Sequence, residues 1–493
     1  MQTSLKILFT ASEVVPFAKT GGLADVAGAL PKALAKLGHE VVVVMPRYYA
    51  IDKGGLEHVP GPLGVPMGPM GELWAGVYKD ELPGSHVPIY FIDYEAFYGR
   101  SGLYADEQGF SYSDNDNRFA FLSKAAFRLC EKIGFKPDVI HAHDWHTAAQ
   151  PALAHSRFYE GFHDAATVLT IHNLQHQGIF FKGLIDVLEI GWERFDPHRF
   201  EAMDGVNLLK GGIAEADVVT TVSRKYAQEI QTPAFGFGLH DHIRAHAHKL
   251  YGILNGVDYD EWNPAIDPLI AQNYDIDDMR GKGVCKADLQ RHFGLPMDES
   301  VPLIGFVGRF AEQKGIGLIA QAIEGLLHLG TQIVMLGTGE KWAEGFFSDI
   351  AGRYSDRFAC HVGYSNALAH KIEAGSDLFL MPSLFEPCGL NQIYSLRYGT
   401  LPIVRATGGL DDTIVNFDPA SRAGNGFKFH DATADALYHT VKWAVDTWRY
   451  DPNSFERMRK NAMQARFDWA HAAAQYEDLY YHALYAKRVR NYR

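Results

Sequence analysis

The chain has 493 residues, of which 47% are hydrophobic and 21% charged, as is typical of a globular protein with two or three domains. Its formal net charge of −13 argues against nucleic acid or an anionic membrane as the main partner. The four cysteines are far apart and form no CxxC pair, no signal peptide is evident, and no apolar run reaches the length of a membrane span, so we expect a cytoplasmic protein.

The N-terminal segment predicts a strand, a glycine turn and a helix. Residues 7–9 are a short apolar run, Lys19-Thr20-Gly21-Gly22 follow as a turn, and apolar residues then recur at helical spacing as far as residue 37. Pro31 lies inside this pattern, which predicts a kink or a restart of the helix. A glycine turn before a helix N-terminus favours phosphate, and Lys19 adds a positive charge. An ordinary tight turn is the alternative, because neither GxGxxG nor GxxxxGK[ST] is present.

The rest of the first half alternates between predicted strands and helices. We expect a loop or a pair of edge strands over 54–71, a surface loop over 99–117, a helix over 118–132, and strands over 87–93, 137–141, 166–171 and 217–222. Three of these strands end in polar clusters, namely HAHDWH (residues 141–146), His172-Asn173 and Ser223. Ligands bind outside the carboxyl ends of parallel strands, so the clusters predict one binding edge. We favour a hydroxyl-binding site with Asp144 as an acceptor over a metal site at His141 and His143.

The second half predicts another doubly wound parallel sheet. Strands are expected over 303–307, 332–336, 358–362, 378–381 and 401–404, with helices over 316–327, 341–354, 367–374 and 434–448, whereas 268–300 is polar and less regular. The alternation pauses near residues 250–264, which predicts domains over 1–252 and 253–468. Residues 469–485 form an amphipathic helical stretch, and we interpret the basic tail 487–493 as a solvated end.

Charged residues follow two strands of the second half. Arg309 and Lys314 lie five residues apart between a strand and a helix, where two cations can hold a diphosphate from two sides, although a plain surface turn has the same pattern. Glu386 lies in LFEPCGLNQ, either as a simple helix cap or as a ligand contact on a backbone fixed by proline and glycine. We expect Cys388 to fill a tight turn rather than to act as a reactive thiol.

Taken together, these motifs resemble the bacterial glycogen synthase family. The resemblance is collinear over nearly the whole chain and includes KTGGLADV (19–26), HAHDWH (141–146), TIHNLQHQG (170–178), TVS (221–223), NGVDYDEWNP (255–264), GRFAEQKG (308–315), PSLFEPCGLNQ (382–392) and GGLDDT (408–413). It implies a GT-B glycosyltransferase, with two Rossmann-like α/β domains facing a central cleft and a C-terminal helix, 469–493, that packs back on the first domain. It also implies retaining transfer of glucose from ADP-glucose to an α-1,4-glucan such as glycogen or a maltooligosaccharide. No metal or other cofactor, no nucleic acid and no membrane would be needed.

The same resemblance implies roles for individual residues. The implied catalytic residues are Asp144, His172, Arg309, Lys314 and Glu386. The implied substrate-binding residues are Lys19, Gly21, Gly22, Asp25, Asn173, Asn255, Tyr364, Cys388, Gly389, Leu390, Gly409, Leu410 and Thr413. Among these, the cations would meet the donor diphosphate, Asp144, His172 and Asn173 would line the glucose and acceptor side, and Tyr364 would border the adenine.

Several alternatives stay open at this stage. No carboxylate pair is evidently arranged for double displacement, and the family instead suggests front-face attack assisted by the departing phosphate oxygen. The sequence does not decide between these mechanisms. The donor could instead be UDP-glucose, the acceptor could differ, or the chain could be an inactive glucan-binding protein. Closure of the two domains on the donor is a further expectation.

Overall fold

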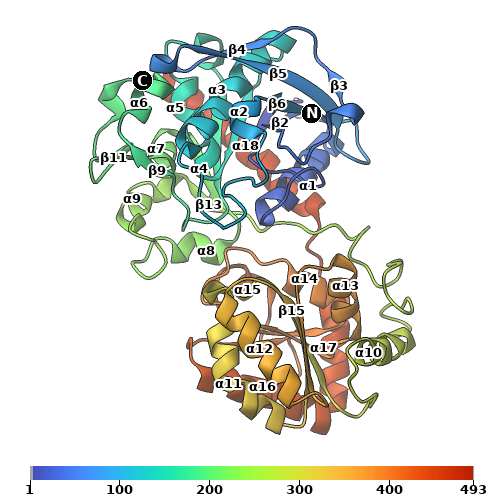
Figure 1. Cartoon of the computed structure of the whole chain (residues 1–493). Helices are drawn as coiled ribbons and strands as arrows, with labels where there is room; N and C mark the ends of the chain where they lie inside the picture. Colours follow the sequence, from blue (N-terminus) through green and yellow to red (C-terminus); the bar gives the residue numbers. More distant parts are fainter. Residues whose placement is uncertain (1–3, 492–493) are drawn as a thin grey trace. The chain divides into compact units, whose positions relative to one another are not determined.

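The computed structural model describes residues 4–491 and separates into two compact units (Figure 1). One unit comprises Met1–Gly256 together with Trp469–Arg493, and the other comprises Val257–Asp468. We describe each unit separately as the N-terminal and the C-terminal unit.

The N-terminal unit is built on a sheet that is parallel in its centre. Across the sheet the strands are β13 (Leu250–Gly252), β12 (Val218–Thr221), β8 (Ala166–Ile171), β7 (Val139–His143), β1 (Lys6–Thr10), β2 (Glu40–Pro46), β6 (Pro88–Asp93), β5 (Glu72–Glu81) and β3 (Glu57–His58), with β4 (Leu63–Pro66) also on β5. The central strands are almost fully buried, as expected for a parallel sheet covered on both faces. Strand β5 pairs antiparallel to β6 and was missed in the sequence, where we expected only edge strands before residue 71.

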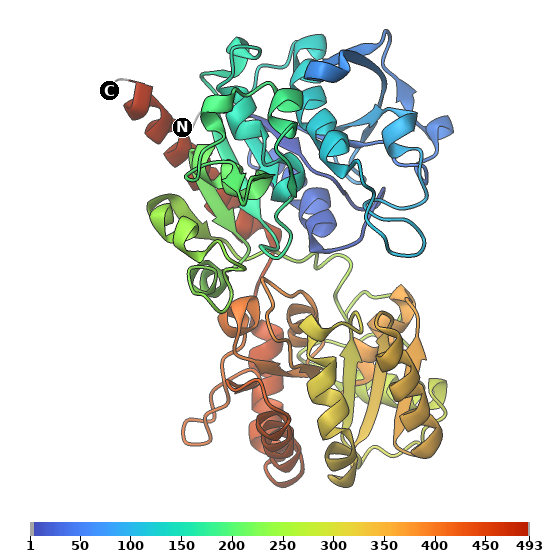
Figure 2. The same ribbon diagram turned by 60° about the vertical axis from the view of Figure 1, so that its left-hand side comes forward.

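Helices cover both faces of this sheet. They are α1 (Gly22–Lys36), α2 (Glu95–Tyr98), α3 (Asn115–Ile133), α4 (Asp144–Thr147), α5 (Gln150–Ala154), α6 (Leu184–Leu188), α7 (Leu208–Glu215), α8 (Arg224–Glu229), α9 (His240–Ala245) and α18 (Trp469–Asn491). Helix α1 continues through Pro31 as one element, so the predicted restart does not occur. Helix α18, drawn in red, lies beside α1 and β8 (Figure 2). A small separate sheet contains β10 (Glu201–Ala202), β11 (Gly205–Asn207) and β9 (Ile179–Phe181).

The expectation of a solvated C-terminal tail is wrong for Lys487. Lys487 is only 2% exposed, because α18 continues to Asn491 along the surface of the unit. The Lys487 ammonium lies 3.9 Å from the Asp217 carboxylate and hydrogen-bonds His155. One cation of the basic C-terminal tail is therefore buried in the fold.

The C-terminal unit contains a second parallel sheet. Its strand order is β16 (Phe358–Val362), β15 (Gln332–Gly337), β14 (Leu303–Val307), β17 (Leu378–Met381), β18 (Leu401–Arg405) and β19 (Phe427–Phe429). Helices α11 (Ile316–His328), α12 (Lys341–Arg353) and α16 (Ala434–Tyr450) form one layer (Figure 1). Helices α10 (Arg280–His292), α13 (Asn366–Gly375), α14 (Asn391–Arg397) and α17 (Pro452–Gln464) form the other, and α15 (Gly408–Thr413) follows β18. Helix α10 was not predicted, because only some of its residues are apolar.

Candidate active site

The Lys19 turn of the N-terminal unit is organised by Glu13, a buried residue that follows β1. The Glu13 carboxylate accepts hydrogen bonds from the backbone N–H of Thr20 and, at 3.2 Å, from that of Gly21. Burial raises the pKa of this carboxyl above its ordinary value. Lys19 begins this turn, and its ammonium lies 2.6 Å from the Asp25 carboxylate. Because Glu13 occupies the Gly21 N–H, the anion-attracting groups left at this turn are the start of α1 and the Lys19 ammonium.

Asp144 lies at the carboxyl end of β7 and connects it to the end of β8. Its backbone is held in the left-handed region with φ of 53°, an unusual state for a residue other than glycine. One carboxyl oxygen accepts the backbone N–H of His172 at 2.7 Å and that of Asn173 at 3.4 Å. Burial raises the pKa of Asp144 to about 7, so near neutral pH this carboxyl exists in both protonation states.

His172 belongs to a buried set of histidine side chains. Its Nε2 lies 3.0 Å from Nδ1 of His143, and burial lowers the pKa of His172 to about 3, so both rings are neutral near pH 7. Nε2 of His143 is buried without a partner among the described residues. An unpartnered nitrogen lone pair costs less than an unpartnered N–H, so Nε2 of His143 carries no proton. His143 is therefore protonated on Nδ1 and donates to Nε2 of His172, which leaves the proton of His172 on its Nδ1. His172 can therefore donate one N–H to a ligand.

The second polar cluster lies at the carboxyl ends of β14 and β17 in the C-terminal unit. The Lys314 ammonium is 2.6 Å from Glu386, and the Ser383 hydroxyl donates to the same carboxylate oxygen at 2.9 Å. Arg309 donates to the Gln313 side chain at 3.1 Å, and the Gln313 side chain donates to the carbonyl of residue 385. Residues from two strand ends thus meet around one carboxylate.

The turn around Glu386 is tightly packed against α15. Gly408 has φ of +46°, and a Cβ at this position would lie 1.9 Å from the Glu386 carbonyl oxygen, so only glycine fits. The buried Gln392 amide donates to the carbonyls of Cys388 and Gly389. Other residues of the expected binding set are buried here as well, namely Gly409, Leu410 and Thr413.

Two further residues of the expected binding set follow the strands β16 and β13. Tyr364 is 81% exposed after β16. Asn255 is buried after β13, and its side-chain oxygen has no partner among the described residues.

Comparison with known proteins agrees with this architecture. A family model described as the starch synthase catalytic domain matches residues 6–245, and one described as glycosyl transferases group 1 matches residues 290–465. The chain is 56% identical over 487 residues to "Glycogen synthase 1" of Geobacter metallireducens, covering 97% of this chain and 96% of that protein. It is 44% identical over 491 residues to "Glycogen synthase" of Treponema denticola, with 98% and 99% coverage. The chain belongs to the glycogen synthase family.

Solved structures give the same fold for this glycogen synthase family member. The catalytic domain of starch synthase IV from Arabidopsis thaliana, bound to ADP and acarbose, has a TM-score of 0.90 and 33% identity, covering 98% of this chain and 100% of that chain. A sucrose-phosphate synthase from Thermosynechococcus elongatus, 18% identical with a TM-score of 0.60, shares the fold. The protein is therefore a glucosyltransferase with the two-domain GT-B fold expected from its sequence.

Sequence reasoning missed two residues of these clusters. Glu13 and Ser383 each hydrogen-bond a neighbour that the motifs had singled out. The available signal was their place, since each lies in the few residues after a buried strand. Over residues 4–491, no group of three or more His, Cys, Asp or Glu side chains is placed to hold a metal ion. Nor does any helix in that range have the length and apolar character needed to cross a membrane.

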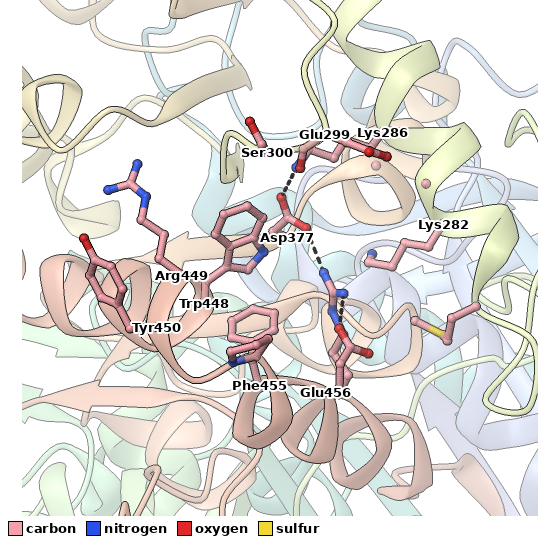
Figure 3. Close-up of a pocket in the computed structure, with 15 residues that line it drawn as sticks. Lys282, Lys286, Glu299, Ser300, Asp377, Trp448, Arg449, Tyr450, Phe455 and Glu456 are labelled. Atoms are coloured by element: carbon pink, nitrogen blue, oxygen red, sulfur yellow. Dashed lines mark hydrogen bonds and ion pairs between the residues drawn. The ribbon is translucent and has the colours of Figure 1, made fainter.

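A pocket of about 670 Å³ lies at the opposite, amino-terminal edge of the C-terminal sheet. Asp377, directly before β17, pairs there with Lys286 and Arg459, each at 2.7 Å (Figure 3). Trp448 lies beside Lys286, whose ammonium is 5.1 Å from the ring centre. Arg459 also pairs with Glu456 at 2.6 Å, so two cations and two carboxylates balance here. These ion pairs connect α10 and α17 to the sheet, and we place the candidate site at the carboxyl edge instead.

Proposed function

We propose that the chain transfers glucose with retention from ADP-glucose to the non-reducing-end 4-hydroxyl of an α-1,4-glucan, such as glycogen or a maltooligosaccharide, and releases ADP without a metal or other cofactor. The proposal rests on the Lys314–Glu386 pair with Arg309 nearby in sequence and linked through Gln313. The ADP in the Arabidopsis starch synthase structure supports an adenine nucleotide as donor.

The cations give this cluster its role with the donor. Negative charge grows on the departing diphosphate as the glycosidic bond breaks, and fixed positive groups stabilise that charge in the transition state. An ammonium has three donor hydrogens, so Lys314 can contact a phosphate oxygen while it stays paired with Glu386. In our proposal Arg309 and Lys314 supply the positive charge that a metal ion supplies in other transferases.

The uncharged groups of the N-terminal unit suit the sugar. Neutral His172 donates from Nδ1 to a hydroxyl, and Asp144 accepts or donates depending on its protonation. In the proposed front-face attack, the departing phosphate oxygen takes the proton of the acceptor hydroxyl, so no second carboxylate is required. Glu386, whose charge Lys314 balances, would contact the glucose from the C-terminal unit.

The test measures transfer of radiolabelled glucose from ADP-glucose and from UDP-glucose to glycogen, with and without EDTA. We expect transfer from ADP-glucose that persists in EDTA and falls about 100-fold or more with Lys314→Ala. Lys341→Ala is the matched control, because this lysine also forms an ion pair, with Glu344, but its side chain is 89% exposed on α12.

Each alternative predicts a different result in the same assay. Transfer from UDP-glucose alone would replace the proposed donor, and loss of transfer in EDTA would contradict metal independence. Binding of glycogen without transfer from either donor would indicate a glucan-binding protein.

A further inference from the structure

Tyr104, in the segment between α2 and α3, connects the carboxyl ends of the neighbouring strands β1 and β7. Its hydroxyl donates to the Glu13 carboxylate at 3.2 Å and lies 2.7 Å from the Ser12 hydroxyl, and both of these residues follow β1. Its ring stacks on that of His146, which follows β7, with ring centres 4.7 Å apart. Tyr104 therefore contacts two of the polar strand ends in the N-terminal unit.

Glu13 connects Tyr104 to the turn before α1. One carboxylate oxygen accepts the Tyr104 hydroxyl, and the other accepts the backbone N–H of Gly21 at 3.2 Å. The Thr20 hydroxyl donates to the same carboxylate at 3.0 and 3.1 Å. The turn that contains Lys19 and leads into the N-terminus of α1 is therefore held by a carboxylate that Tyr104 orients.

The backbone of Tyr104 is in turn held by Asn115, the first residue of α3. The Asn115 amide N–H donates to the Tyr104 carbonyl at 2.9 Å, and the amide oxygen accepts from Arg118 at 2.6 Å. Because an arginine side chain only donates, the amide oxygen must face Arg118 and the nitrogen must face Tyr104. The backbone N–H of Tyr112 donates to the same carbonyl at 3.1 Å. Asn115 is 5% exposed, so water has little access to these contacts.

Arg118 fixes Asn115 from the interior of the unit. It is fully buried, its Nε donates to the carbonyl of Phe97 at 2.7 Å, and its guanidinium lies 4.9 Å from the centre of the Tyr112 ring. A buried cation is costly unless polar groups surround it, so the folded protein keeps these contacts. The guanidinium thereby determines the position of Asn115 and, through it, that of Tyr104.

We propose that Asn115 and Arg118 are positioning residues for the donor, because by holding Tyr104 they place the Lys19 turn against the donor diphosphate. The inference rests on the proposed function for the identity of the donor. Neither Asn115 nor Arg118 touches the substrate. Displacement of the turn weakens its contact with the diphosphate before and during the reaction alike, so the loss falls on KM for ADP-glucose rather than on kcat.

Asn115→Asp is the smallest change that tests this role. The carboxylate keeps the size of the side chain and its contact with Arg118, but it has no N–H for the Tyr104 carbonyl. A negative charge at the start of α3 does not weaken that helix. We expect KM for ADP-glucose to rise about three- to tenfold, with kcat and KM for glycogen within about twofold of the wild type. Asn453→Asp is the matched control, because it adds the same charge to the first turn of α17 in the other unit.

Titration calorimetry with ADP measures donor affinity without transfer. We expect Asn115→Asp to weaken ADP binding by about the same factor as it raises KM. Equal ADP binding by the wild type and the variant would overturn the positioning role and leave the proposed function intact. A wild type that does not bind ADP would overturn the proposed function and the positioning role with it. A lower Tm together with an equal loss of kcat would show a role in folding alone and would also overturn it.

Two further variants test the route through Tyr104. Tyr104→Phe removes the hydroxyl that reaches Glu13, so adding Asn115→Asp to it should raise KM for ADP-glucose no further. Independent, additive effects would overturn this route. Arg118→Lys keeps the charge, but one nitrogen replaces the two that bond Asn115 and the carbonyl of Phe97, so it should raise KM in the same way. An unchanged KM in Arg118→Lys would remove Arg118 from the positioning set.

Discussion

The two polar clusters at the strand ends differ in the charge of their side chains. In the N-terminal unit, burial raises the pKa of Asp144 to about 7 and lowers that of His172 to about 3, so both groups can be uncharged near neutral pH. In the C-terminal unit, Lys314 and Glu386 are paired at 2.6 Å, and the lysine side chain stays 21% exposed. In the proposed function, the neutral groups suit sugar hydroxyls and the ion pair suits phosphate, so the same sheet architecture would serve two ligand chemistries.

The largest expected effect is that of Glu386→Gln. The amide keeps the size of the side chain and can accept from Ser383, but it leaves Lys314 without its counter-charge. We expect kcat to fall about 100- to 1,000-fold, within the range for loss of one preorganised electrostatic group. Steady-state kinetics with ADP-glucose measure it, with Glu312→Gln as the control because that carboxylate lies in the same turn as Lys314. Activity near the wild-type level would remove Glu386 from the proposed site.

Asp144→Asn tests whether burial of the Asp144 carboxyl lowers the stability of the protein. A carboxyl whose pKa rises from about 3.9 unfolded to about 7 folded binds more protons in the native state, so its contribution to stability decreases from about pH 4 to about pH 7. The amide cannot ionise. We expect the variant to lack this decrease and to have a higher Tm than the wild type at pH 8, together with reduced kcat.

Thermal unfolding between pH 5 and pH 8 measures this difference. Equal pH dependence in the two proteins would contradict the buried, elevated pKa of Asp144. A stable variant with the wild-type kcat would leave the raised pKa of Asp144 unchallenged, but it would show that the Asp144 carboxyl has no part in the reaction.

His143→Ala should have a smaller effect, because His143 acts through His172. Without the donor at Nδ1, His172 is free to move its proton to Nε2, and we expect kcat to fall about tenfold. His143→Asn places an amide N–H near the lost Nδ1 donor and should restore most of the activity. Failure of Asn to restore it, with Tm unchanged, would contradict the positioning role.

Lys487→Met should have the smallest effect and no influence on catalysis. It removes a buried ammonium near Asp217, but that carboxylate still accepts two hydrogen bonds from Thr167. We expect a loss of about 3 kcal/mol in the free energy of unfolding, measured by denaturant titration, because the buried Asp217 carboxylate loses its counter-charge, and unchanged kinetics. A loss of activity would connect α18 to the site.

The alternation of strands and helices, the polar residues after the strands and the family could all be predicted from the sequence. These features are local, because burial on both faces gives a parallel strand its continuous apolar run and the polar motifs follow the strands directly. Prediction failed where the local pattern was weak, as at β5, or where a helix is mostly polar, as at α10.

Which side chains meet depends on how the chain folds in three dimensions. Lys314 reaches Glu386 across 72 residues of sequence, and Tyr480 of α18 reaches His141 across 339, with the oxygen and ring nitrogen 2.8 Å apart. Glu13 satisfies the Gly21 N–H that the sequence had offered to phosphate. Such contacts depend on strand register and helix packing, which place distant residues together, and burial at those positions then sets the charge each group keeps.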